Sequence, residues 1–154
     1  MNVLKSLLHN IGVVIIGFGV AFIGTKTDFV FQIHRFHSAL AIAAGWLLLA
    51  LGFLLRVWAT WYFYENHMKV IKLVPQEKLI TAGPYRISRN PLYLGGNVLI
   101  FFGAALVLGS PSALVLIGLH LFLMDLFIRR EERQLERTFG EEWMQYKNQV
   151  RRWI

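Results

Sequence analysis

Long apolar segments separated by short polar ones run along this chain of 154 residues. Four of them are long enough to cross a bilayer as helices, which takes roughly 17–25 residues each; they cover residues 7–24, 38–55, 92–108 and 112–128. Only Gly109-Ser110-Pro111 separates the last two segments, so we expect a tight antiparallel hairpin there. The pattern predicts an all-α integral membrane protein, a single domain built as a bundle of four transmembrane helices.

Glycines recur seven residues apart inside these segments, as Gly12 and Gly19, Gly17 and Gly24, Gly45 and Gly52, and Gly96 and Gly103. Seven residues are nearly two helical turns, so the two members of a pair share a face. Small residues on one face allow close contact between membrane helices, although glycine is also simply frequent in such helices. We therefore predict glycine-lined contacts at these positions.

Charged and aromatic residues extend the second and fourth segments. Beyond residue 55, we expect the Arg56 side chain to snorkel to the headgroups. We also expect the helix to continue along the interface towards Pro75, with its aromatic residues forming a belt at headgroup depth. Residues 129–138 predict a charged helix that ends at Phe139-Gly140, because glycine readily takes the left-handed terminal conformation. A short interfacial helix over 141–150 follows, and we interpret residues 151–154 as an interfacial anchor.

Composition agrees with a membrane location, with 56% hydrophobic residues and a mean hydropathy of +0.50. The absence of cysteine excludes disulfides and thiolate chemistry. A net charge of +7 could indicate nucleic acid, but in a membrane protein basic residues more often set topology and meet anionic lipid headgroups. We therefore expect membrane lipid, and no nucleic acid, as a partner.

The distribution of basic residues predicts the orientation. With four spans, both termini and the second loop share one side, which collects thirteen Lys and Arg residues, while Lys26 and Arg35 lie on the other. The positive-inside rule places the richer side in the cytoplasm. We expect a multi-pass protein of a prokaryotic inner membrane with cytoplasmic N- and C-termini.

A polar turn, residues 83–95, interrupts the apolar pattern before the third span. Its two prolines disfavour helix at Gly83 and Asn90, and irregular backbone beside a membrane is tolerated where it lines a cavity. The hairpin returns the chain to the same height at Glu131-Glu132. We therefore predict a cytoplasm-facing pocket formed by residues 78–95 and 129–150, with an apolar substrate entering from the bilayer.

Residues 89–95 read Arg-Asn-Pro-Leu-Tyr-Leu-Gly, which resembles the Arg-His-Pro-x-Tyr-x-Gly motif of the isoprenylcysteine carboxyl methyltransferases and their bacterial and archaeal relatives. The lead-in over 79–85 is also similar. Downstream, the Glu pair at 131–132 with Phe-Gly-x-x-Trp-x-x-Tyr over 139–146 resembles the C-terminal signature of that family. The resemblance covers residues 79–150, nearly half of the chain, and phospholipid amine methyltransferases are close relatives within this class.

The resemblance implies a methyltransferase with a cytosol-facing S-adenosylmethionine site. The positions that match cofactor contacts are Lys78, Leu79, Ile80, Tyr85, Arg89, Asn90, Pro91, Leu92, Tyr93 and Glu131. The candidate catalytic residues are Glu131, Arg129 and Asn90. A turn of this kind offers backbone polar groups, tyrosine rings and a carboxylate to such a cofactor, and in-line positioning can supply most of the rate enhancement of methyl transfer.

Two departures from the family pattern leave the methyl acceptor open. Asn90 stands where the family usually has His, and an amide cannot titrate near neutral pH. Phe127 stands where the prenylcysteine enzymes have an Arg one turn before the first Glu. The acceptor could therefore be an isoprenylcysteine-like carboxylate, an amine or another lipophilic molecule.

Plainer interpretations compete at several positions. Arg89 could anchor on anionic lipid, Glu131 could be a solvated charge, and Glu132 and Arg129 are expected to be surface charges. In the fourth span, Asp125 is expected to pair with Arg129, and His120 is expected to pack against another helix. The histidines at 34 and 37 have too few further ligands near them in the sequence to indicate a metal site. The rival functions are an NADPH-dependent oxidoreductase of the sterol-reductase type and a non-enzymatic membrane scaffold or transport subunit.

Overall fold

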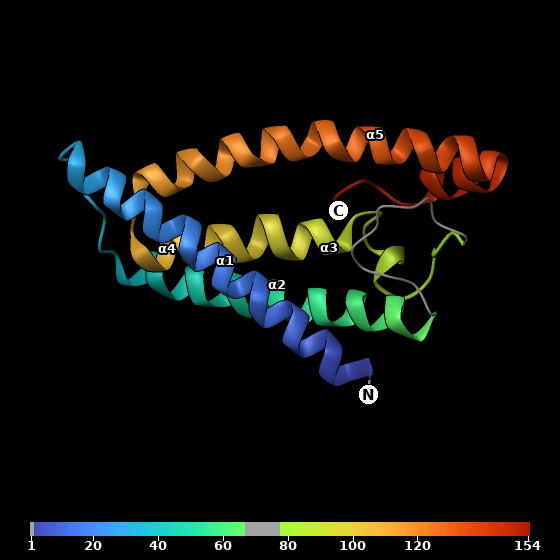
Figure 1. The fold of residues 1–154 in the computed structure, drawn as a ribbon, viewed down its shortest axis with the longest axis horizontal. Coiled ribbons are helices and arrows are strands. Elements are labelled where there is room, and N and C mark those ends of the chain that lie inside the picture. Colours follow the sequence, from blue (N-terminus) through green and yellow to red (C-terminus); the bar gives the residue numbers. More distant parts are fainter. Residues whose placement is uncertain (1, 67–77) are drawn as a thin grey trace.

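The computed structural model describes residues 2–66 and 78–154, and its elements are helical (Figure 1). They are α1 (Asn2–Val30), α2 (Ala39–Glu65), the 3-10 turn η1 (Gly83–Arg86), α3 (Pro91–Tyr93), the π-helix η2 (Leu94–Ile100), α4 (Phe101–Leu108) and α5 (Pro111–Gln149). Four stretches are long and apolar enough to cross a membrane: Leu4–Val30, Ala39–Glu65, Pro91–Leu108 and Pro111–Gln149. The predicted all-α bundle with four spans is confirmed.

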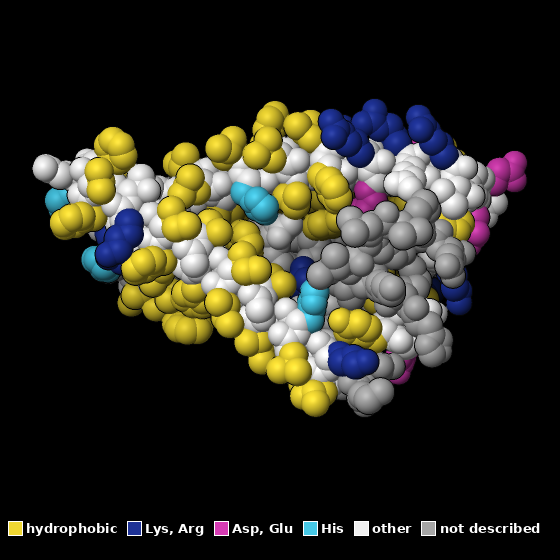
Figure 2. Space-filling model, in the orientation of Figure 1, with side chains coloured by type: hydrophobic (Ala, Val, Ile, Leu, Met, Phe, Trp, Pro, Cys, Tyr) yellow, Lys and Arg dark blue, Asp and Glu magenta, His cyan; other side chains and the backbone are white. Residues whose placement is uncertain are grey.

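The outer faces of these helices are apolar. Large side chains such as Ile15, Phe29 and Leu123 are 66%, 83% and 54% exposed, which suits contact with lipid tails rather than water. Figure 2 shows hydrophobic side chains over the left and middle of one face and a group of basic ones along the second half of α5. The basic cluster marks the end of the bundle at which the chain leaves the apolar region.

The third and fourth spans form the expected hairpin, since α3, η2 and α4 together make one span that turns directly into α5. Gly109 has a φ of 61°, a left-handed conformation that glycine adopts without strain. Asp28, near the end of α1, caps the start of α5: its Oδ1 accepts from the Ser112 N–H at 3.0 Å and its Oδ2 from the Ser110 hydroxyl. A carboxylate from the first span thus holds the hairpin in place.

Glycine-lined contacts occur at three of the four predicted pairs. A Cβ on Gly24 would lie 2.5 Å from Ala113, and one on Gly52 would lie 2.6 Å from the Gly95 carbonyl oxygen. Such spacing lets helix backbones approach closely. The prediction for Gly12 and Gly19 is wrong, because no described atom lies within 4 Å of a Cβ at either position. They share a face of α1 that differs from the Gly17 and Gly24 face, and only one of the two faces packs inward.

Helix α2 continues past residue 55, as expected, and is described to Glu65. The half-exposed Trp58 and Trp61 belong to the predicted aromatic belt, while the predicted continuation towards Pro75 lies outside the described residues. Arg56, however, does not snorkel, because only 8% of its surface is exposed. It points into the protein instead of towards the headgroups.

Helix α5 changes direction at Gly140, where φ is 49° and ψ is −118°. The predicted end of the charged helix at Phe139-Gly140 is therefore confirmed as a sharp bend, and residues 141–149 form the expected second helical stretch. Figure 1 shows this last stretch and the C-terminal residues turning back beside the turn that precedes α3. The reversal places Trp143 and Tyr146 in a second core, with Ala59, Phe63 and Tyr85.

Candidate active site

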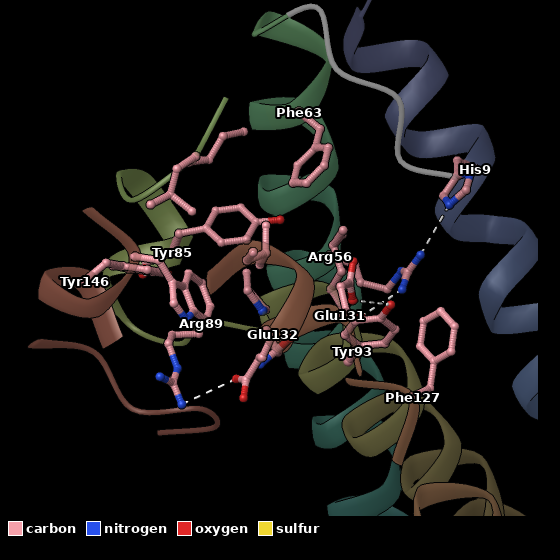
Figure 3. A pocket seen from close by; sticks show the side chains of 17 residues that line it. His9, Arg56, Phe63, Tyr85, Arg89, Tyr93, Phe127, Glu131, Glu132 and Tyr146 are labelled. Atoms are coloured by element: carbon pink, nitrogen blue, oxygen red, sulfur yellow. Dashed lines mark hydrogen bonds and ion pairs between the residues drawn. The ribbon is translucent and has the colours of Figure 1, made fainter. Parts of the chain in front are cut away.

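A cavity of about 340 Å³ lies where α2, the polar turn and both parts of α5 meet (Figure 3). This volume falls in the range of small-molecule sites, about 300–1,000 Å³. Its wall includes every expected cofactor contact except Lys78, namely Leu79, Ile80, Tyr85, Arg89, Asn90, Pro91, Leu92, Tyr93 and Glu131. The polar turn and the distant glutamate pair therefore border one cavity, as the hairpin geometry suggested.

Lys78 and Arg129 lie elsewhere. The Lys78 side chain is exposed, and its Nζ lies 3.4 Å from Asn66 Oδ1. The Arg129 side chain is 56% exposed and pairs with Asp125, the i,i+4 contact that the sequence also suggested. Two residues correspond to about 200° on a helix, so Arg129 faces away when Glu131 faces the cavity. The geometry does not support the catalytic role predicted for Arg129.

The polar turn has the irregular backbone that its prolines require. Gly83 has a φ of 63°, and Asn90 lies at φ −129° and ψ 51°, outside the helical region. The chain end then secures it: the Arg89 N–H donates to the Arg151 carbonyl at 3.0 Å, and the Ser88 hydroxyl donates to the Arg152 carbonyl at 3.0 Å. The turn is therefore held by residues more than sixty positions downstream.

Glu132 joins the same turn to the chain end. It is 6% exposed, accepts from Arg152 Nε at 3.1 and 3.2 Å and from Arg152 Nη2 at 2.5 Å, and lies 3.4 Å from Arg89 Nη2. Hydrogen bonding to this carboxylate raises the pKa of the Arg152 guanidinium. The predictions of Glu132 as a surface charge, of Arg89 as a lipid anchor and of Arg152 as part of an interfacial anchor are wrong. The bend at Gly140, whose geometry the sequence does not specify, brings these charges together.

Aromatic rings form one wall of the cavity, at the left of Figure 3. Tyr146 Oη donates to the Tyr85 carbonyl at 2.7 Å, and the Arg89 guanidinium lies 5.6 Å from the Trp143 ring centroid. Burial raises the pKa of Tyr85 well above its ordinary value, so its hydroxyl stays protonated. Figure 3 shows this hydroxyl directed into the cavity. A protonated phenol there can donate a hydrogen bond to a bound molecule.

Three buried polar atoms of this wall have no hydrogen-bond partner among the described residues: Tyr85 Oη, Arg89 Nε and Trp143 Nε1. Buried polar groups are normally satisfied, so such a cluster indicates a place where a ligand or water completes the bonding. On the opposite wall, the Tyr93 hydroxyl donates to Glu131 Oε2 at 3.0 Å. The cavity therefore offers donors on one side and a carboxylate on the other.

Arg56 and His9 also line the cavity, and the sequence interpretation missed both. Arg56 Nε donates to Asn10 Oδ1 at 2.7 Å, its Nη1 to the Leu92 carbonyl at 2.8 Å, and its Nη2 lies 3.2 Å from His9 Nε2. A signal was present, because an ionisable residue inside an apolar segment is costly and usually functional. The position of Arg56 at the end of an apolar segment hides this signal, because snorkelling also accounts for a charge there.

Outside the cavity, His120 stacks on Phe101 with ring centroids 5.4 Å apart, which confirms the expected helix contact. No group of three or more His, Cys, Asp or Glu side chains in the described part of the chain is arranged to hold a metal ion.

Comparison with known proteins identifies related sequences. The family model for phospholipid methyltransferases matches residues 40–142. A phosphatidyl-N-methylethanolamine N-methyltransferase of Saccharomyces cerevisiae is 36% identical over 56 residues, 36% of this chain and 27% of the yeast protein. An uncharacterized protein of Haemophilus influenzae is 38% identical over 58 residues, 37% of this chain and 92% of that protein. The match thus spans about a quarter of the yeast enzyme, and no solved structure matches.

Proposed function

Because this chain belongs to the phospholipid methyltransferase family, we propose that it transfers a methyl group from S-adenosylmethionine to a lipophilic acceptor at the cytoplasmic face of a membrane. The observation that carries the proposal is the single cavity bordered by both family-like blocks, the turn before α3 and the glutamates of α5. Family membership does not favour the sterol-reductase or scaffold alternatives.

The residues of the cavity fit this cofactor. Apolar and aromatic side chains such as Leu79, Ile80 and Phe63 provide a surface on which an adenine ring can pack. The unpartnered Tyr85 hydroxyl can donate to ribose or carboxylate oxygens, and the Glu131 carboxylate suits an ammonium or ribose hydroxyls. The Tyr93 ring borders the same space and can attract a cationic sulfonium through its π face.

When bound, the cofactor supplies a methyl group already activated on a sulfonium sulfur, so the protein mainly has to position the acceptor and exclude water. We favour an amine acceptor, because Phe127 stands where the prenylcysteine enzymes have an arginine and the yeast relative is named for a methylated ethanolamine lipid. A protonated amine must lose its proton before its nitrogen can attack the methyl group, and the methylated amine must lose one before it can be methylated again. Glu131 is the carboxylate at the cavity that can take up that proton.

The acceptor would enter from the bilayer. Phe127 lines the cavity and is also 51% exposed, so the cavity wall reaches the lipid-facing surface of α5. The cavity lies at the end of the bundle where the exposed basic residues of α5 gather (Figure 2), which the positive-inside rule assigns to the cytoplasm. A water-soluble cofactor and a membrane-borne acceptor would then approach from different directions.

Calorimetry on the detergent-purified chain tests the proposal. We expect binding of S-adenosylmethionine and of its demethylated product, and no binding of NADPH. Tyr93→Ala and Glu131→Ala should each weaken cofactor binding by about tenfold, the effect of losing one charge-assisted contact. Arg129→Ala is the matched control, since it removes an exposed charge two residues from Glu131. A response to NADPH alone, or unchanged affinity in both cavity variants, would refute the proposal.

The acceptor can be identified directly. Incubation of the protein with methyl-labelled cofactor and a total lipid extract, followed by mass spectrometry of the labelled product, should yield an N-methylated phospholipid. Label on an isoprenylcysteine carboxylate would instead assign the alternative acceptor that the sequence left open.

A further inference from the structure

We propose that Arg56 and His9 form an anion site that binds the phosphate group of the lipid acceptor, an inference that rests on the proposed methyltransferase function. Both residues come from the first two spans, outside the two motif blocks at 79–95 and 131–146; Arg56 lies within the residues that match the family model, and His9 lies before them. Figure 3 shows them together at one end of the cavity, next to Tyr93, Glu131 and Phe127.

Arg56 is a buried cation that forms no ion pair with the described residues. No carboxylate of the described residues lies within 4.0 Å of its guanidinium, whereas Arg89, the other arginine of the cavity wall, pairs with Glu132 at 3.4 Å. Burying a charge without compensation is costly, so such positions are retained where a ligand supplies the opposite charge. Arg56 therefore marks the place in this cavity where an anion is most strongly stabilised.

The guanidinium is held rigidly by neutral partners. Asn10 accepts from Nε at 2.7 Å, and Asn10 is itself held by the Ser6 carbonyl at 2.8 Å and the Thr60 hydroxyl at 2.7 Å. Among the described residues, Asn10, the Leu92 carbonyl and His9 each take one N–H donor of Arg56, which uses three of its five donors. The remaining donors keep the fork geometry that matches a phosphate.

His9 adds a further donor. If its Nε2 accepts from Arg56, the imidazole is neutral and its other nitrogen, Nδ1, carries the proton. His9 is partly exposed on α1, and Phe127 on α5 is 51% exposed, so this end of the cavity reaches the lipid-facing surface between the two helices. A headgroup can therefore reach the site while its acyl chains stay in the bilayer.

The arrangement offers a separate partner to each end of a phosphoethanolamine headgroup, a cation for the phosphate and a carboxylate for the amine. Arg56 is bonded to the carbonyl of Leu92, and the next residue, Tyr93, is bonded to Glu131. The cation of the phosphate site and the carboxylate that would receive the amine proton are thus hydrogen-bonded to neighbouring residues of α3. Only two carbons separate phosphate and amine in ethanolamine, so binding the first positions the second for methyl transfer.

The test compares acceptor and cofactor affinities in the full chain. Phosphatidylethanolamine in mixed micelles is titrated at saturating cofactor, and calorimetry gives the cofactor Kd. We expect Arg56→Gln to raise the KM for the lipid about tenfold or more with an unchanged cofactor Kd. Arg56→Lys keeps the charge but not the forked guanidinium, so its KM should lie between those of the wild type and Arg56→Gln. His9→Gln should raise the KM less than Arg56→Gln does. Lys5→Gln is the control, because it removes an exposed cation one turn from His9.

A second readout needs no turnover. Native mass spectrometry should show phosphatidylethanolamine retained by the wild type and lost from Arg56→Gln, or from His9→Gln if the arginine variant does not fold. A parallel rise in cofactor Kd would assign Arg56 to the cofactor and overturn the inference, as would an unchanged KM with equal lipid retention. Arg56-dependent binding of inorganic phosphate, with no retention of phosphatidylethanolamine by the wild type, would assign the site to free phosphate instead. Failure of the wild type to bind cofactor would count against the proposed function, not against this site.

Discussion

Replacing Glu132 by Gln should destabilise the protein more than any other single loss of charge at the polar turn. The carboxylate is 6% exposed and faces two guanidiniums, those of Arg89 and Arg152. An amide keeps the size and one acceptor oxygen but removes the negative charge. Two cations would then face each other beside the cavity with no carboxylate between them.

The magnitude follows from burial. Breaking a fully buried ion pair by removing one partner costs about 3–5 kcal/mol. The Arg89 side chain is 8% exposed, but that of Arg152 is 24% exposed and can recover part of its hydration. We therefore expect Glu132→Gln to cost about 2–3 kcal/mol. Glu136→Gln on the same helix is the control, because its pair with Lys147 is exposed and such pairs contribute about 0–1 kcal/mol.

A double-mutant cycle isolates the interaction. Unfolding of Glu132→Gln, Arg152→Gln and the double variant in detergent, followed by circular dichroism, should give a coupling of about 1.5–3 kcal/mol, the value for hydrogen bonds to charged groups. Additivity within about 0.5 kcal/mol would show that the two residues do not interact, and would refute the account of how the chain end holds the turn.

Three further predictions concern other parts of the bundle. Asp28→Ala should lower the unfolding temperature, since it removes a helix cap worth about 1–2 kcal/mol, and an unchanged melting curve would contradict that role. Gly52→Ala should cost about 1–3 kcal/mol by overpacking, whereas Gly118→Ala, with open space around it, should not destabilise; equal effects in denaturation would argue against the close helix contact. Tyr93→Phe keeps the ring but loses the bond to Glu131, so calorimetry should show cofactor affinity reduced about three- to tenfold, and full affinity would mean that this bond does not shape the pocket.

The fold was predictable from sequence because its determinants are local. Apolar length set the four spans, Gly109 and Pro111 marked the hairpin, and Gly140 marked the end of the charged helix. The neighbouring positions of the turn and Glu131 followed from simple geometry, since a hairpin returns the chain to its starting height. None of these inferences needed to know how side chains pack.

The errors have a different origin. Arg56, Glu132 and Arg152 were each assigned to lipid or water from their position along the chain, but the structure buries the first two and pairs the third. Their environments depend on contacts between residues 20 or more apart, such as Arg56 with Asn10 and Glu132 with Arg152. A hydropathy pattern carries no information on such contacts.

The π-helix η2 has a consequence for how this span tolerates change. It lies between Tyr93, which faces the cavity, and Gly103, which packs against Gly45 in the membrane. Each residue of an ordinary α-helix adds about 100° of rotation, and the wider turns of a π-helix add less per residue. Converting Leu94–Ile100 to α-helix at its present length would therefore shift the rotational phase of one half of the span against the other. Either Tyr93 would swing away from Glu131 or Gly103 away from Gly45. The wide turns thus allow one span to direct a tyrosine into the cavity at one end and a glycine against a neighbouring helix at the other.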